Sequence, residues 1–184
     1  MDYFILHKQE FVPEPKIKNW LHMLDKRTVS KKIGNLISKH TVFEIEHYGQ
    51  TDYPDIITHP CLMVSKKVKN TIELYDKTIQ FERINLQDRK IKKTYIYYIP
   101  RLLKLDVLTE KVELTRDKTT IIAAEIHLYK TEQKPLFETG IDEFVTCLLI
   151  HRTLAESLLR RGVYGIGLTE VKSKKEVQTN ESTT

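Results

Sequence analysis

The sequence predicts an α+β fold: an antiparallel or mixed sheet with two related strand–helix–strand units, packed by a few helices. The first observation is a repeat, because residues 61–68 and 147–154 each carry an apolar run that continues into helix-like spacing. Internal similarity of this kind indicates one supersecondary unit used twice. The second observation is the composition of the 184 residues, of which 40% are apolar and 30% charged. These fractions suit a buried core beneath a solvated surface and exclude global disorder.

Residues 1–58 are predicted to form an N-terminal lobe, and the sequence leaves open whether this lobe is part of the same domain. Residues 2–7 are apolar enough for a first strand, and residues 41–48 alternate as a half-buried strand does. Between them, Ser30 is suited to cap a helix whose apolar side chains recur at helical spacing. Residues 49–60 contain two prolines and several polar residues, so we expect the boundary in this loop.

Residues 59–171 are predicted to form the main α+β domain. Ser65 stands at the N-cap position of its first helix, and His151 takes the equivalent place in the second repeat copy. Gly162 is a suitable stop for the second helix. Residues 172–184 are polar without periodicity, and we expect a disordered tail there. The expected strands of the domain are residues 61–64, 79–84, 94–99, 119–129, 144–150 and 164–171.

The expected compartment is the cytoplasm. The first residues lack the long apolar stretch of a signal peptide, and no apolar run approaches the ~18 residues of a membrane span. Cys61 and Cys147, the only cysteines, hold equivalent places in the two repeat copies. We expect both to be buried, inert thiols. A disulfide between them is the less favoured alternative, because the cytosol keeps thiols reduced.

The sequence contains no recognisable catalytic, metal or cofactor motif. The seven histidines have no histidine partner at helical spacing, and no cysteine or carboxylate completes a zinc-like pattern. Residues 162–167 include three glycines, but these follow a helix and precede a strand, the reverse of a phosphate-binding loop. We therefore interpret the glycines as turn and packing positions. The sequence predicts a protein that is not an enzyme, with no catalytic residue, no metal and no cofactor.

The net charge of +5 is concentrated in two stretches, residues 26–39 and residues 83–93. The second begins at the end of the strand at 79–84 and continues as a basic loop through Lys93 into the strand at 94–99, and its only acid is Asp88. Clustered positive charge attracts acidic partners over long range but does not distinguish nucleic acid from protein. From charge alone, the candidate partner-binding residues are Arg83, Arg89, Lys90, Lys92 and Lys93.

Nucleic acid is one class of partner that suits these cations. Tyr95, Tyr97 and Tyr98 follow them in the chain, and cations beside stacking rings favour single strands. Alternation along the strand places Tyr95 and Tyr97 on one face and Tyr98 on the other, so at least one of these sets is core in a two-layer fold. A basic nucleic-acid-binding accessory protein is therefore the alternative function.

Several motifs between residues 59 and 171 occur in a set order. An aliphatic run, a serine and a helix start are followed by an aromatic strand with a Leu-Asp turn, then by a second such unit and a closing strand with glycines. In this order they resemble a family of bacterial polymorphic-toxin immunity proteins, immunity family forty-three, close to family eleven and formerly a domain of unknown function. His151 departs from the serine commonly expected at the second helix start. The residues that carry the likeness are 62–68, 97–99, 105–106, 136–137, 148–150, 154–158 and 165–168.

The resemblance implies stoichiometric neutralisation of a toxin. An immunity protein binds one cognate toxin domain, covers its active site or locks an inactive conformation, and itself catalyses nothing. A basic inhibitor suits a toxin that is acidic around its active site, so both basic stretches become interface candidates. A membrane is not an expected partner, and the sequence does not determine the oligomeric state.

Overall fold

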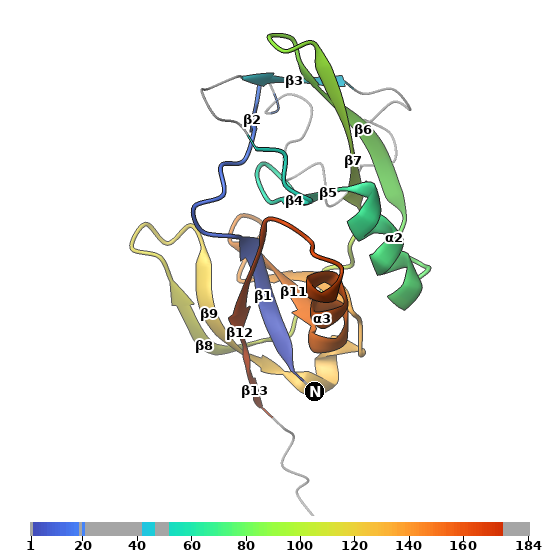
Figure 1. Cartoon of the computed structure of the whole chain (residues 1–184). Helices are drawn as coiled ribbons and strands as arrows, with labels where there is room; N and C mark the ends of the chain where they lie inside the picture. The colour runs from blue at the N-terminus through green and yellow to red at the C-terminus, as the bar shows by residue number, and fades with distance from the viewer. Residues whose placement is uncertain (1, 19, 21–41, 47–51, 175–184) are drawn as a thin grey trace, which may run out of the picture.

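The computed structural model describes residues 2–18, 20, 42–46 and 52–174 (Figure 1). Within these residues the chain forms a mixed α+β fold, with three sheets and two α-helices. The predicted helix capped by Ser30 and the basic stretch at 26–39 lie outside the described residues. In the described part of the chain, no helix has the length and apolarity needed to cross a bilayer.

The first sheet has the strand order β10-β11-β1-β12, and all of its neighbouring strands are antiparallel. Tyr3 and Ile5 of β1 point into one buried cluster, while Leu6 points into another on the opposite face. Because both faces of the sheet are covered, β1 is a continuous apolar run and not an alternating one. The strands are β1 (Tyr3–Lys8), β10 (Leu136–Gly140), β11 (Thr146–His151) and β12 (Ile166–Glu170).

The second sheet, of order β13-β9-β8, lies against the first. Val171, between β12 and β13, donates its N–H to the carbonyl of Tyr3 at 3.0 Å, so one chain segment passes from the first sheet into the second. The buried cluster between the two sheets includes Phe137, Ile126 and Leu149. The strands are β8 (Leu108–Leu114), β9 (Ile121–His127) and β13 (Lys172–Lys174), with β13 parallel to β9.

The third sheet has the order β2-β3-β6-β7-β5-β4. Only the β3–β6 pair is parallel. One of its faces packs a separate buried cluster that includes Phe43, Leu86 and Tyr97. The strands are β2 (Lys16–Ile17), β3 (Val42–Glu46), β4 (Ile56–Ile57), β5 (Met63–Val64), β6 (Phe81–Asp88) and β7 (Lys93–Pro100).

Two helices, α2 (Lys66–Tyr75) and α3 (Arg152–Arg160), pack against each other over the cluster that joins the first and third sheets. Both predicted N-caps are confirmed: the Ser65 hydroxyl accepts from Val68 N at 3.4 Å, and His151 Nδ1 accepts from Thr153 N at 3.3 Å. A 3-10 turn, Leu128–Thr131, follows β9.

Each helix connects two strands that belong to the same sheet but are not hydrogen-bonded to each other. Helix α2 follows β5 and precedes β6, and β7 lies between these two strands. Helix α3 follows β11 and precedes β12, and β1 lies between them. Since the inserted strand is antiparallel to both neighbours, the two flanking strands of each set run in the same direction.

The described residues before 59 are built into the sheets of the later chain. Strand β1 pairs with β11 and β12, and β3 pairs with β6, so a boundary at residue 58 separates strands that share hydrogen bonds. At the other end, Lys172–Lys174 form β13 where the sequence predicted the start of a disordered tail. Main-chain pairing with β9 does not require apolar side chains, which is why composition missed this strand. Residues 175–184 lie outside the described residues.

The predicted basic loop is wrong in extent. Strand β6 runs to Asp88, because Ile84 and Leu86 alternate with polar residues and are fully buried. Only residues 89–92 connect β6 to β7. One of the two cysteines differs from expectation: Cys147 is buried as predicted, whereas Cys61 is partly exposed.

Candidate functional site

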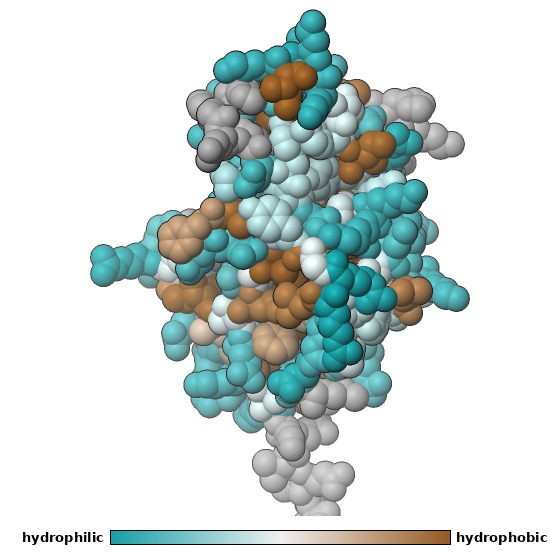
Figure 2. All heavy atoms as spheres, in the orientation of Figure 1, coloured by the Kyte–Doolittle hydropathy of each residue, from teal (hydrophilic) through white to brown (hydrophobic). Residues whose placement is uncertain are grey.

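All five cations chosen from the sequence belong to one β-hairpin, formed by β6 and β7. Arg83 lies within β6, Arg89, Lys90 and Lys92 lie in the connecting turn, and Lys93 begins β7. The hairpin projects at the top of the molecule in Figure 1, and hydrophilic residues gather around its tip in Figure 2. We refer to this element as the basic hairpin.

Asp88 builds the turn of the basic hairpin. Its Oδ1 accepts hydrogen bonds from the N–H groups of Lys90 at 3.0 Å and Ile91 at 3.2 Å. Aspartate is favoured at such turns because its short carboxylate reaches the backbone two or three residues on. Lys92 adopts a left-handed conformation, with φ of 53°, before β7 begins. The turn therefore holds the cations of the tip on an ordered backbone.

A tyrosine pair anchors the same aspartate from the inner side. Tyr53 donates its hydroxyl to Asp88 Oδ2 at 2.7 Å, and its ring stacks on that of Tyr95 at 3.5 Å between centroids. Burial raises the pKa of the Tyr53 hydroxyl, and the neighbouring Asp88 carboxylate raises it further. Since Asp88 is fully buried, its negative charge is not displayed beside the cations.

The outward charge of the basic hairpin is therefore positive. Arg89 Nε lies 3.6 Å from Glu44 Oε2, and Lys18 Nζ lies 3.2 Å from Glu44 Oε1. Throughout the part of the chain that the structure describes, no carboxylate lies within ion-pair distance of the other four cations. These four side chains are exposed: Arg83, Lys90, Lys92 and Lys93.

Of the three tyrosines that follow the cations, Tyr97 is buried and the other two are partly buried. Tyr97 is buried and donates its hydroxyl to the carbonyl of Pro54 at 2.6 Å. Tyr95 is stacked on Tyr53, and Tyr98 lies partly buried beneath the ammonium group of Lys69, 5.6 Å from the ring centroid. Tyr97 offers no ring face to a nucleobase, and Tyr95 and Tyr98 each already have a partner against the ring, which weighs against the free stacking surfaces of a single-strand platform.

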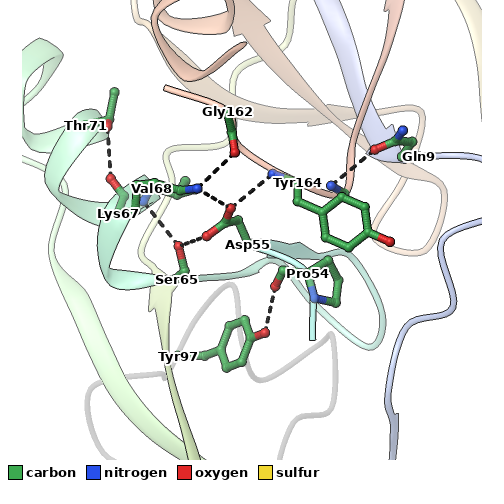
Figure 3. A network of polar contacts seen from close by, with 11 residues as sticks. Gln9, Pro54, Asp55, Ser65, Lys67, Val68, Thr71, Tyr97, Gly162 and Tyr164 are labelled. Atoms are coloured by element: carbon green, nitrogen blue, oxygen red, sulfur yellow. Dashed lines mark hydrogen bonds and ion pairs between the residues drawn. The ribbon is translucent and has the colours of Figure 1, made fainter. Parts of the chain in front are cut away.

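A second polar cluster, which sequence reasoning missed, lies where α2 meets the turn after α3 (Figure 3). Asp55 is at its centre: Oδ1 accepts from the Ser65 hydroxyl at 2.6 Å, and Oδ2 accepts from Tyr164 N at 3.0 Å and lies 2.6 Å from Lys67 Nζ. Lys67 Nζ also donates to the carbonyl of Gly162 at 3.0 Å. We refer to these residues as the Asp55 junction.

Electrostatics in the Asp55 junction favour the charged carboxylate. Burial by itself raises the pKa of Asp55, but hydrogen bonds from Lys67, Ser65 and Tyr164 N and the charge of Lys67 outweigh it and lower the pKa below the ordinary value. Because these partners belong to the fold, the junction stabilises the structure. Asp55 and Tyr164 are far apart in the sequence, so no local signal connects them.

Metal-binding geometry is absent from the described residues. Within the described ranges, no group of three or more histidine, cysteine or acidic side chains is placed to hold a metal ion. Two of the histidines serve local roles: His151 caps α3, and His7 Nε2 lies 3.0 Å from the hydroxyl of Thr169. His22, His40 and His47 lie outside the described residues.

Comparison with known proteins gives no assignment, because no protein-family model matches the chain and no curated protein matches it. The basic hairpin and the sequence motifs are therefore the features that bear on the function.

Proposed function

We propose that this chain is an immunity protein, which binds a cognate bacterial toxin domain stoichiometrically and neutralises it without catalysis. The observation that carries the proposal is the basic hairpin, whose Arg83, Lys90, Lys92 and Lys93 have no described ion-pair partner. The resemblance of residues 59–171 to polymorphic-toxin immunity proteins supplies the class of partner. In this proposal the protein acts in the cytoplasm, where it meets the toxin.

The topology supports the part of the proposal that concerns two related units. In both, a side-chain-capped helix connects two strands of the same direction, with one antiparallel strand inserted between them. We infer that β5–α2–β6 and β11–α3–β12 are copies of one unit. The two units differ in the origin of the inserted strand. In the first unit this strand is β7, which follows β6 in the chain, whereas in the second unit it is β1, the N-terminal strand.

The charge of the basic hairpin predicts how fast the interaction forms and how it depends on salt. Exposed cations on a projecting hairpin raise the rate of encounter with an acidic surface, and salt weakens this effect. Complementary charge acts mainly on the association rate. Nucleic-acid binding is the second candidate, favoured by the same cations but not by the tyrosine rings, of which Tyr97 is buried and Tyr95 and Tyr98 have partners within the chain.

Co-expression with the toxin domain encoded by the neighbouring reading frame tests the proposal. We expect the toxin domain to be lethal alone and tolerated when the wild-type chain is present. The charge-reversed variant Lys90→Glu/Lys92→Glu should associate with the toxin domain at least about tenfold more slowly at low salt, because steering charges act on the on-rate.

The matched control is Arg116→Glu/Lys118→Glu, which makes the same charge change on the exposed turn between β8 and β9. This variant should protect as the wild type does. Continued lethality beside well-expressed wild-type protein would exclude the immunity function for that pair. Steeply salt-dependent binding to a generic single-stranded oligonucleotide would favour the second candidate instead.

A further inference from the structure

Among the residues that the structure describes, α2 is the helix that packs on the outer face of β3, β6 and β7, and it does not extend along the whole of that face. Register places Val42 beside Asn85, and Asn85 beside Ile96, so these three residues form one row across the strands. The next row toward the tip is Glu44, Gln87 and Thr94. We refer to the two rows, together with Arg83, as the open face.

Helix α2 covers only the base of this side of the sheet. Its Lys69 ammonium lies 5.4 Å from the ring centroid of Phe81 and 5.6 Å from that of Tyr98. Arg83 stands opposite Tyr98, so the open face begins where this coverage ends. Figure 1 shows the hairpin continuing past α2 toward its tip.

The apolar content of the open face is unusual for a solvent-facing side of a sheet. Val42 is 50% exposed and Ile96 is 44% exposed, although both belong to strands whose other face is fully buried. Outward positions of such sheets are normally polar. A single exposed aliphatic side chain needs no explanation, but here two stand in one row, one on each side of Asn85, and can contact the same partner.

Charge around the row selects the kind of partner. Arg83 is diagonal to Ile96 on the same face, within the ~7–8 Å that separates such neighbours. Glu44, the acid of the face, is already paired by Lys18 and Arg89. The complementary surface is therefore one with carboxylates around an apolar side chain. A second copy of this chain would bring Arg83 and the basic tips together, and like charges repel.

We propose that the open face is the toxin-docking surface, with Val42 and Ile96 as apolar anchors and Arg83 as the charged contact. This inference rests on the proposed function, and it extends the site from the tip of the basic hairpin to the sheet beneath it. The occupant is an acidic protein surface, because an aliphatic row can bury an apolar side chain but offers no ring for a nucleobase to stack on.

The experiment compares Ile96→Ser with Ile122→Ser, a matched control on β9 that is 47% exposed and lies in a different sheet. Affinity for the purified toxin domain of the neighbouring reading frame is measured by calorimetric titration. Ile96→Ser and Val42→Ser should each weaken binding about 10- to 30-fold, as buried interface anchors do. Arg83→Ala should also weaken binding, whereas Arg116→Ala and Ile122→Ser should bind as the wild type does. Unchanged thermal unfolding of each variant shows that folding is intact.

The outcomes separate the two proposals. Suppose that the wild type protects, and that Ile96→Ser and Val42→Ser bind the toxin domain as tightly as the wild type does. The open face is then not the docking surface, while the immunity function stands. Equal losses of affinity for the toxin domain in Ile96→Ser and Ile122→Ser would also show that the open face is not the docking surface. If the wild type neither binds nor protects, both proposals fall. If the wild type is a dimer that Ile96→Ser dissociates, the occupant is a second copy and the proposed acidic partner is wrong.

Discussion

Asp55 and Asp88 show how the fold uses carboxylates that it removes from solvent. Asp88 is fully buried and is shared between the turn of the basic hairpin and the Tyr53 hydroxyl. Asp55 is paired with Lys67 and accepts hydrogen bonds from Ser65 and Tyr164. Both acids are satisfied by internal partners. At the tip of the basic hairpin the exposed ionised side chains are therefore cations, while Asp88 is directed inward.

We predict that Asp55→Asn lowers the free energy of unfolding by about 1.5 to 3 kcal/mol at neutral pH, because it removes the charge from several hydrogen bonds. The folded-state pKa of Asp55 lies below its unfolded value. Its stabilisation is thus fully present above the unfolded pKa and is lost as pH falls through the folded one. The difference between wild type and variant should shrink toward pH 3, as measured by urea unfolding.

The control for this prediction is Asp106→Asn, whose carboxylate is 90% exposed and lies 3.5 Å from Lys130. An exposed pair of this kind contributes little, so this variant should change the unfolding free energy by less than about 1 kcal/mol. A loss for Asp55→Asn that stayed constant from pH 7 to pH 3 would contradict the assigned role of its charge.

At the scale of elements, two of the three glycines after α3 have different structural roles. Gly162 has φ of 60° and ends the helix: its N–H donates to the carbonyl of Leu159, and Val163 N donates to that of Leu158. This is the Schellman pattern of a helix C-terminus. Gly165 has φ of 91°, and a Cβ there would lie 2.5 Å from Pro54 Cβ. The interpretation as turn and packing positions is confirmed for these two glycines.

We predict that Gly165→Ala is more destabilising than Gly162→Ala. At Gly162 nothing lies within 4 Å of a Cβ, so alanine there incurs only the left-handed backbone cost of about 1 to 2 kcal/mol. At Gly165 the overlap with Pro54 and with the Ile56 carbonyl adds about 1 to 3 kcal/mol. Urea unfolding of both variants measures the difference, and equal losses would show that Pro54 moves aside.

For the whole molecule, the position of β1 matters most. It is the N-terminal strand, yet it lies inside the first sheet and contributes Tyr3, Ile5 and Leu6 to two buried clusters. Removing it would leave β11 and β12 without their shared neighbour. The chain beyond residue 58 therefore lacks a complete sheet of its own.

We predict that a fragment of residues 59–171 does not fold cooperatively. The matched control is a fragment of residues 1–171, which has the same C-terminus and retains β1, and which should show a cooperative transition. Circular dichroism during urea unfolding distinguishes them. A cooperative transition in the shorter fragment would mean that β11 and β12 can close the sheet without β1.

The sequence by itself determined the features that depend on neighbouring residues. Helical spacing and the polar residues before it located α2 and α3 with their caps at Ser65 and His151, and the glycine at 162 located the end of α3. Apolar and β-branched runs located most strands, with errors at their ends such as the extension of β6 to Asp88. The five cations of the candidate site were chosen from charge, and they share one hairpin because they are close in the chain.

Tertiary structure alone decided the features that depend on distant residues. Insertion of β1 between β11 and β12, and of β7 between β5 and β6, comes from strand pairing, which leaves no local pattern in the sequence. The same holds for the Asp55 junction and for the row of Val42, Asn85 and Ile96, whose members come from three strands. Burial of the Tyr97 ring, which weighs against a stacking platform, likewise follows from which face of the sheet meets the core. Local propensity fixes elements within a few residues, whereas pairing and burial are settled by the packing of the whole chain.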